Sequence, residues 1–218
     1  MNKKRSIALT LLSLIHLASA EQPKFFVDVQ VINPQTVTPR ELDRHKELAA
    51  QVFFSYDTSI QTAGPLKSYY DYFNIFFTAF KEQKNEEFLI SAYDSQGHII
   101  GGLFGKALIG PLSVLDIKEE QTAHYLDCVY VDCDLQNKGI ATTMINFLIT
   151  NTSKNKKRTP LFLYVWAINT TARKVYEKCG FTLITDAQHP DGKGTAAAHA
   201  LQTNSGYNPN DFVVYRKN

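Results

Sequence analysis

The chain has 218 residues, which is enough for one domain of ordinary size with a well-developed core. Hydrophobic residues make up 44% of the chain and charged residues 20%, so the composition excludes an intrinsically disordered protein. After the first 20 positions no apolar run is long enough for a membrane helix, which excludes an internal membrane span.

The N-terminus has the pattern of a secretory signal peptide. Basic residues at positions 3–5 precede an apolar run from Ile7 to Leu17, and Ala18-Ser19-Ala20 forms a small-x-small cleavage site. The pattern predicts a signal peptide over 1–20 and the functional domain over 21–218. The alternative is an apolar first helix of the domain. A cleaved leader predicts a periplasmic or secreted protein, whereas an unused leader predicts a cytoplasmic one.

Neither the charges nor the cysteines point to nucleic acid or to a metal. The 23 basic and 21 acidic residues give a net charge of +2, and loss of the three basic residues of the leader would change it to −1. A near-neutral domain has no general attraction for nucleic acid. Cys128, Cys133 and Cys179 have neither the spacing of a disulfide framework nor that of a zinc site, so no structural metal is expected.

The first half of the chain predicts a strand, two helices and a hairpin. An alternating strand over 25–32 is followed by Thr38-Pro39-Arg40-Glu41, a capping box that predicts a helix to about Phe54. The next helix, over 65–83, is rich in aromatic residues, which predicts packing on a sheet or, alternatively, a substrate wall. Strands over 88–93 and 99–108 form a hairpin through a polar turn.

The second half predicts two strand–helix units. A nearly continuous apolar run over 125–131 indicates a buried central strand, and a helix follows from Gly139 to about Asn151. Beyond it the sequence predicts, in order, a strand over 161–166, a helix over 170–179 closed by Gly180, an extended segment over 181–184, a loop over 186–210 and a strand over 212–216. This order, without repeats or linkers, predicts a single mixed α/β domain.

The loop after the central strand has the composition of a phosphate-binding site. Residues 136–141, QNKGIA, have the form Q-x-x-G-x-A, and a helix start offers free N–H groups beside the positive end of the helix dipole. Gly139 has no side chain to keep a pyrophosphate away from the backbone. The six residues alone do not distinguish this site from an ordinary strand-to-helix turn, and they are not a Walker loop.

Two motifs together carry a family resemblance. VYVDCDLQNKGIATTM, residues 129–144, and LFLYVWAINTTARKVYEKCGF, residues 161–181, resemble the GCN5-related N-acetyltransferases, the GNAT family, over about residues 88–185. The resemblance implies the acyl-CoA N-acyltransferase fold, a single α/β domain whose mixed central sheet has two splayed strands and is flanked by helices. Asn137 replaces a glycine of the usual motif, and because asparagine tolerates left-handed backbone, the loop is expected to be intact.

The resemblance implies acetyl-CoA as the co-substrate. The pantetheine arm would lie in the gap between the splayed strands, the pyrophosphate would bind the N–H groups of the loop, and Asn169 would reach the arm. The implied cofactor-binding residues are Val129, Tyr130, Val131, Gln136, Asn137, Lys138, Gly139, Ile140, Ala141, Thr142, Asn169, Ala172 and Tyr176.

Two residues are candidates for the chemistry of acetyl transfer to an amine. By family position Tyr176 would be the acid that protonates the leaving thiolate, or else a packing residue. Asp127 lies four residues before Val131 and would be the base, because burial raises the pKa of a carboxylate toward a working value. A structural, hydrogen-bonded aspartate is the alternative. A backbone N–H, most plausibly that of Val131, would stabilise the oxyanion.

The resemblance therefore implies an N-acetyltransferase that acts directly on a primary amine. We expect the amine of a small molecule, because aromatic faces such as those of the helix over 65–83 attract cationic amines and Asp127 would add a negative charge near the reacting nitrogen. The protein is expected to be a monomer or homodimer. The alternatives are a non-catalytic CoA-binding or interaction module, and a secreted effector that acetylates protein lysines or N-termini. A bacterial protein is expected, because Asn169 lies in a glycosylation sequon where a glycan would block the cofactor site. Export conflicts with the cytosolic supply of acetyl-CoA unless another compartment, such as a host cell, provides it.

Overall fold

A computed structural model describes residues 26–59, 66–83, 87–109, 113–117, 122–153, 159–202 and 208–218. The expected signal peptide over 1–20 lies outside these residues. None of the helices that the structure describes is both long and apolar enough to cross a membrane.

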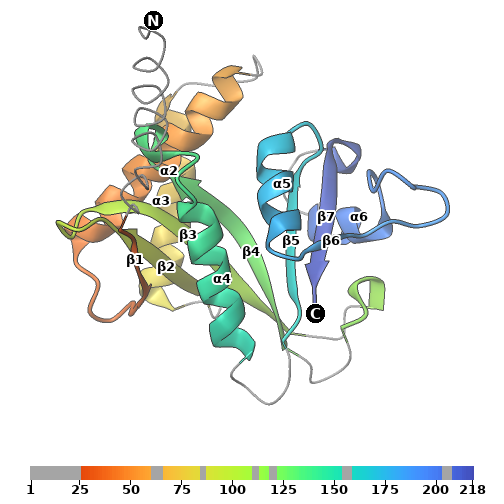
Figure 1. Cartoon of the computed structure of the whole chain (residues 1–218), viewed down its shortest axis with the longest axis horizontal. Coiled ribbons are helices and arrows are strands. Elements are labelled where there is room, and N and C mark those ends of the chain that lie inside the picture. Colours follow the sequence, from red (N-terminus) through yellow and green to blue (C-terminus); the bar gives the residue numbers. More distant parts are fainter. Residues whose placement is uncertain are drawn as a thin grey trace, which may run out of the picture.

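The strands and helices follow the order that the sequence predicts, and Figure 1 shows their arrangement. They are β1 (Asp28–Ile32), α2 (Pro39–Ser59), α3 (Leu66–Glu82), β2 (Glu87–Tyr93), β3 (Ile99–Ile109), η1 (Ser113–Leu115), β4 (Thr122–Val131), η2 (Cys133–Leu135), α4 (Ile140–Ser153), β5 (Leu161–Trp166), α5 (Thr170–Lys178), β6 (Thr182–Leu183), α6 (Ala196–Gln202), η3 (Pro209–Asp211) and β7 (Phe212–Lys217).

The described strands form one seven-stranded sheet in the order β1-β2-β3-β4-β5-β7-β6. The β4–β5 pair is parallel and the other neighbours are antiparallel, so the sheet is mixed, as predicted. Helices α2 and α3 cover one face of the β1–β4 half and α4 covers the other, while α5 and α6 flank the β5–β7–β6 half (Figure 1). The fold is that of a single α/β domain.

Strands β4 and β5 pair only over a short stretch and then separate. Their ladder joins 124–126 to 161–163 and ends there. Figure 1 shows the two strands meeting at one end and diverging toward α4 and α5, which gives a V-shaped gap. The splayed strands that the family resemblance implied are therefore confirmed.

A β-bulge lies at the closed end of this gap. In the β3–β4 ladder Gly105 is opposite Leu126 and Phe104 is opposite Cys128, so Asp127 is an extra residue. A Cβ on Gly105 would lie 2.4 Å from the carbonyl oxygen of Tyr125, so only glycine fits here without a shift of the backbone. Because a bulge bends its strand and increases the local twist, it turns β4 away from β5 just beyond their last pair.

The aromatic helix α3 packs onto the sheet. Phe73, Phe77 and Phe80 are each 1% exposed, and the rings of Phe77 and Phe80 contact Phe104 of β3 edge to face. Their burial on the sheet confirms the packing interpretation for these three residues. The alternative of a substrate wall is wrong for them, because buried rings offer no surface to a ligand.

The start of α2 has the predicted capping box. Thr38 N–H donates to Glu41 Oε2 at 2.8 Å, and Glu41 N–H donates to Thr38 Oγ1 at 3.2 Å. The hydrogen bonds from Thr38, first from its N–H and then from its hydroxyl, lower the pKa of Glu41. The reciprocal bonds satisfy two N–H groups at the helix start, so the start of α2 is fixed locally.

The prediction of a loop over 186–210 was wrong at 196–202, which form α6. Thr195 Oγ1 accepts a hydrogen bond from Ala198 N–H at 3.2 Å and caps the helix. Gly192, Gly194 and Pro190 favoured a loop, but the alanine-rich run AAAHALQ has high helix propensity. Ala197 and Ala198 are buried against β7 and β5, and this packing stabilises a helix too short to be stable alone.

Candidate active site

Beyond its last pair with β5, β4 has backbone hydrogen-bonding groups that point away from β3. Asp132 N–H donates to Ile100 O at 2.9 Å, just beyond the position where Val131 faces Gly101. In an antiparallel ladder this bond makes Val131–Gly101 a non-hydrogen-bonded pair, so the N–H and C=O of Val131 point away from β3 and toward the gap. Val129, two residues earlier and opposite Leu103, has the same orientation. An extended ligand in the gap could therefore pair with β4 as a strand would.

The side chains of this segment alternate between the two faces of the sheet. Val129 and Val131 pack in the apolar cluster under α4, and Cys128 and Tyr130 pack against α2 and α3. Cys128 is buried, and burial raises the pKa of its thiol well above the ordinary value. A thiol that keeps its proton is a poor nucleophile, which agrees with direct transfer rather than an acetyl-cysteine intermediate.

The loop from β4 to α4 has the backbone geometry that its sequence implied. Asn137 has φ 63° and Gly139 has φ 82°, so both are left-handed, and the expectation that Asn137 replaces a glycine without breaking the loop is confirmed. Residues 136–139 are exposed, whereas Ile140, the first residue of α4, is 1% exposed and anchors the helix in the core. The loop thus presents the start of α4 to solvent.

Gly139 is required for its conformation and not for packing. A Cβ at this position would meet nothing within 4 Å. A ligand can therefore approach the first turn of α4, at Ala141 and Thr142, past a position that has no side chain. Free N–H groups, the positive end of the helix dipole and open space together suit a phosphate group.

Helix α5 begins beside the end of β5, and Asn169 is its N-cap. Asn169 Oδ1 accepts a hydrogen bond from Ala172 N–H at 3.0 Å. The guanidinium of Arg173 donates to Ala167 O and to the Tyr215 hydroxyl, each at 3.0 Å, and ties the helix to β7. The amide oxygen of Asn169 is thus used within the protein, and its amide NH₂ group is the part available to donate to a ligand.

Tyr176 lies two turns into α5, against Phe181 and Tyr215, at ring-centroid distances of 6.1 and 6.3 Å. Burial raises the pKa of Tyr176 far above its ordinary value, and the thiols of Cys128 and Cys179 add to the shift. Tyr176 also packs against the apolar cluster that contains Val129 and Val131 of β4. A phenol with a raised pKa keeps its proton at neutral pH and can donate it.

Asp127, the bulge residue, is in an environment that suits a base. Burial raises the pKa of its carboxyl to about 6, the nearby ammonium of Lys106 lowers it, and the carboxylate of Glu87 raises it. The side chain keeps some exposed surface even though protein surrounds most of it. A pKa near the working pH is what an effective general base requires.

Sequence reasoning missed three residues beside Asp127. Glu87, Lys106 and Tyr125 lie opposite one another on β2, β3 and β4. The Lys106 Nζ atom lies 5.6 Å from the ring centroid of Tyr125. Tyr125 is 4% exposed, and its hydroxyl has no hydrogen-bond partner among the residues that the structure describes. The β3–β4 register brings these residues together. The bulge sets this register, and no pattern in the sequence predicts the bulge.

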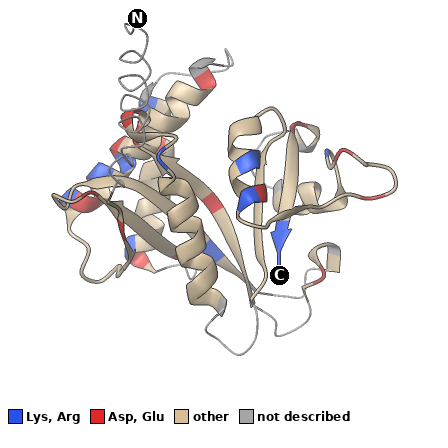
Figure 2. Cartoon of the chain, in the orientation of Figure 1, with Lys and Arg blue, Asp and Glu red and all other residues tan. Residues whose placement is uncertain are grey.

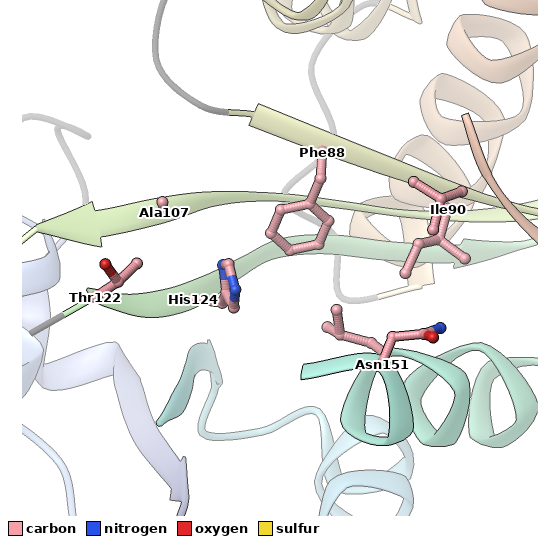
Figure 3. A pocket seen from close by; sticks show the side chains of 8 residues that line it. Phe88, Ile90, Ala107, Thr122, His124 and Asn151 are labelled. Carbon is pink, nitrogen blue, oxygen red and sulfur yellow. The ribbon is translucent and has the colours of Figure 1, made fainter. Parts of the chain in front are cut away.

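A separate apolar hollow of about 320 Å³ lies on the α4 side of the sheet, and Figure 3 shows its lining. Its lining residues are Val31, Phe88, Ile90, Ala107, Thr122, His124, Leu148 and Asn151. None of the residues predicted for the cofactor or for catalysis lines it. The hollow is thus a feature apart from the gap between β4 and β5.

Charges are mixed over the molecule. Figure 2 shows basic and acidic residues interspersed on both halves of the described chain. The electrostatics of the gap are therefore set by its own groups, Asp127, Glu87 and Lys106, and by the start of α4. Within the described residues no group of three or more His, Cys, Asp or Glu side chains could hold a metal ion.

Comparisons with solved structures agree with this architecture. Arabidopsis thaliana NAA60 in complex with acetyl-CoA is 18% identical, with a TM-score of 0.56 over 88% of this chain and 96% of that one. The PaiA N-acetyltransferase from Thermoplasma acidophilum in complex with coenzyme A is 14% identical, with a TM-score of 0.57 over 87% and 98%. AAC(6')-Iy with a bisubstrate analogue is 14% identical, with a TM-score of 0.52 over 72% and 91%. At these identities the likeness shows the fold.

Comparison with curated proteins gives no significant match. A model of the Acetyltransferase (GNAT) family, however, matches residues 55–181, more than half of the chain. The matched region includes both motifs, the gap between β4 and β5, the loop before α4 and helix α5. The protein therefore belongs to the GNAT family of acetyltransferases.

Proposed function

We propose that this protein transfers an acetyl group from acetyl-CoA directly to the primary amine of a small molecule. The observation that carries the proposal is the early end of the β4–β5 ladder. Beyond it the backbone groups of Val129 and Val131 point away from β3, and no described strand pairs with them on that side. The left-handed loop before α4 lies at one end of β4, and Asp127 lies at the closed end of the gap. Similar folds are known in complex with acetyl-CoA and with coenzyme A.

The residues divide the proton transfers between them. Asp127 removes a proton from the acceptor ammonium, and the neutral amine attacks the acetyl carbonyl carbon. The Val131 N–H, which points into the gap, stabilises the negative charge that develops on the carbonyl oxygen. When the carbon–sulfur bond breaks, Tyr176 gives its proton to the leaving sulfur, and the nitrogen releases its second proton to restore the Tyr176 hydroxyl, so the products are an amide and a free thiol. The two raised pKa values suit these opposite tasks.

The surroundings of Asp127 support a small cationic acceptor. Two carboxylates, of Asp127 and Glu87, outnumber the one ammonium of Lys106, so the local charge favours an amine. The rings of Tyr125 and Tyr164 stack at a centroid distance of 5.7 Å beside the last β4–β5 pair, and aromatic faces attract cations.

Acetyl-CoA turnover against a panel of acceptors tests the function. The panel contains polyamines, amino acids, aminoglycosides, lysine peptides and free protein N-termini. We expect turnover with at least one small amine. A strong preference for lysine peptides or N-termini over every free amine would support a protein acetyltransferase instead. Binding of acetyl-CoA without turnover on any acceptor would support the non-catalytic module.

We also propose that the leader is cleaved after Ala20 and that the domain acts outside the cytoplasm that makes it. The basis is the sequence of 1–20 alone. N-terminal sequencing of the protein recovered from outside the cytoplasm should begin at Glu21. A mature protein that begins at Met1 would contradict export.

The pyrophosphate site makes a prediction about Gly139. Gly139→Gln should weaken CoA binding at least tenfold, about 1.4 kcal/mol, because a side chain would occupy the space of the phosphate. Isothermal titration calorimetry measures this directly. Gly97 in the β2–β3 turn is a matched control: its φ is +80° against +82° for Gly139, and neither Cβ would meet an atom within 4 Å. Gly97→Gln therefore has the same backbone strain and should leave CoA affinity unchanged; equal losses in both variants would refute the site.

The role of Tyr176 predicts a change in turnover without a change in cofactor binding. Tyr176→Phe keeps the ring against Phe181 and Tyr215 but removes the acidic proton. We expect kcat to fall by roughly 10² or more, the size typical for loss of a general acid, with little change in acetyl-CoA affinity. Turnover within twofold of the wild type would leave Tyr176 as a packing residue only.

The raised pKa of Asp127 predicts a pH-dependent stability. The carboxyl titrates at about 6 in the folded protein against 3.8 as its ordinary value, so folding favours its protonated form. The resulting stabilisation is fully present below pH 3.8 and is lost as the pH rises through about 6. Between pH 5 and pH 8 the wild type should lose about 1 kcal/mol of unfolding free energy relative to Asp127→Asn, measured by denaturant titration.

Glu41→Gln is the control for this measurement. Hydrogen bonds from the N–H and the hydroxyl of Thr38 lower the pKa of Glu41, so it is ionised throughout the range from pH 5 to pH 8. Because glutamine also completes a capping box, the effect of this substitution on stability should be constant over that range. As a base, Asp127 also predicts that kcat/KM falls as the pH drops below about 6. A stability difference for Asp127→Asn that is independent of pH would contradict the raised pKa.

A further inference from the structure

A buried histidine joins helix α2 to strand β4. His45 is 1% exposed, its Nδ1 atom lies 2.7 Å from the Tyr130 hydroxyl, and its Nε2 atom lies 2.6 Å from the Ser91 hydroxyl. The ring stacks on Phe77 at 5.9 Å and meets the Tyr130 ring edge to face at 5.9 Å. Both ring nitrogens are therefore bonded, and the three side chains form a polar chain from β2 through α2 to β4.

The histidine is neutral at neutral pH. Burial lowers the pKa of His45 to about 4, an effect that Glu41 opposes and Arg44 reinforces. One ring nitrogen of a neutral imidazole donates and the other accepts, and hydroxyl groups can complement either role. The chain of hydrogen bonds is thus complete without a charge. It has no access to solvent, so His45 does not exchange protons with a substrate.

The sheet is shaped to admit this chain. Gly102 on β3 faces Tyr130, and a Cβ on Gly102 would lie 2.3 Å from the Tyr130 hydroxyl. The glycine therefore makes the room in which the hydroxyl reaches His45. The approach of Tyr130 thus explains the glycine at position 102 of β3.

The part of β4 that His45 holds is the part that has lost a neighbour. Beyond Leu126 the strand pairs with β3 alone, because its ladder to β5 has ended. Tyr130 lies between Val129 and Val131, whose backbone groups face the gap. The residue before His45, Arg44, donates to Asp132 Oδ2 at 3.2 Å, so consecutive residues of α2 hold β4 at two points. Asp132 in turn accepts from Asp134 N–H at the start of the cofactor loop.

We propose that His45 is a positioning residue: through Tyr130 it fixes the free half of β4, so that the backbone groups of Val129 and Val131 are held in place for the acyl donor. This inference rests on the proposed function, because it concerns the strand on which the donor binds. A hydrogen bond to a neutral buried histidine restrains the strand without bringing a charge near the reacting carbonyl. Preorganisation of this kind lowers the cost of binding and of stabilising the oxyanion.

Three variants of the full chain separate positioning from core stability. His45→Gln and Tyr130→Phe both break the bond to β4, whereas Ser91→Ala breaks only the bond at the far end of the chain. Ser91 does not contact β4 through this network, and its hydroxyl is as deeply buried as the others. The measurements are thermal unfolding, amide hydrogen exchange at Tyr130 and Asp132 by NMR, CoA affinity by calorimetry, and kcat with the best amine of the panel.

We expect all three variants to lose stability, but only His45→Gln and Tyr130→Phe to exchange the amides of Tyr130 and Asp132 at least tenfold faster. In those two variants CoA affinity and kcat should each fall about tenfold. Ser91→Ala should bind CoA and turn over as the wild type does. If Ser91→Ala matches the other two in exchange and CoA affinity, the chain is only a part of the core and the proposal is wrong.

The design remains decisive if one variant does not fold or if the protein has another activity. Should His45→Gln fail to fold, Tyr130→Phe, which keeps the ring and its packing, gives the same comparison with Ser91→Ala. If the wild type shows no turnover on any amine, the proposed function is wrong. Amide hydrogen exchange and CoA affinity would still show whether His45 restrains β4. If Tyr130→Phe leaves the amide hydrogen exchange rate at position 130 unchanged, His45 does not restrain β4, whatever the activity of the protein.

Discussion

The structure depends on the point at which β4 and β5 stop pairing. Up to Leu126 the two strands share a parallel ladder, and one residue later Asp127 inserts a bulge that turns β4 away. A sheet strand without a neighbour normally exposes costly unpaired backbone groups in the interior of a fold. Here those groups belong to Val129 and Val131, and a ligand with the shape of an extended chain can satisfy them. The break in the sheet is therefore also the proposed binding site for the acyl donor.

The same bulge separates the environments of the two catalytic candidates. Asp127 lies at the closed end of the gap, where burial raises its pKa and Lys106 limits the rise, so that it can accept a proton near neutral pH. Tyr176 lies on α5 across the gap, where burial keeps its proton in place. An acid and a base on opposite walls can act on the same reacting centre without neutralising each other. The aromatic helix α3, by contrast, is part of the core that supports these walls.

Helix α2 has a part in this arrangement that its sequence does not reveal. Its capping box and apolar face indicate an ordinary amphipathic helix, yet Arg44 and His45 reach Asp132 and Tyr130 at the end of β4. Strands with one free edge are mobile unless side chains hold them, and two successive residues of a rigid helix do so at low entropic cost. Gly102 of β3 admits the Tyr130 side chain that completes the contact.

The sequence by itself determined the order of the elements, the capping box of α2, the left-handed loop and the family, because these depend on residues close together in the chain. It placed Asp127 and Tyr176 only by resemblance and missed α6, whose short alanine-rich run is stabilised by packing on β5 and β7. Only the tertiary structure decided which residues meet across strands. One extra residue in β4 sets the register that joins Glu87, Lys106 and Tyr125, and it also sets the contact of His45 with Tyr130. An inserted residue has this effect because it reverses the face to which every side chain on one side of it points.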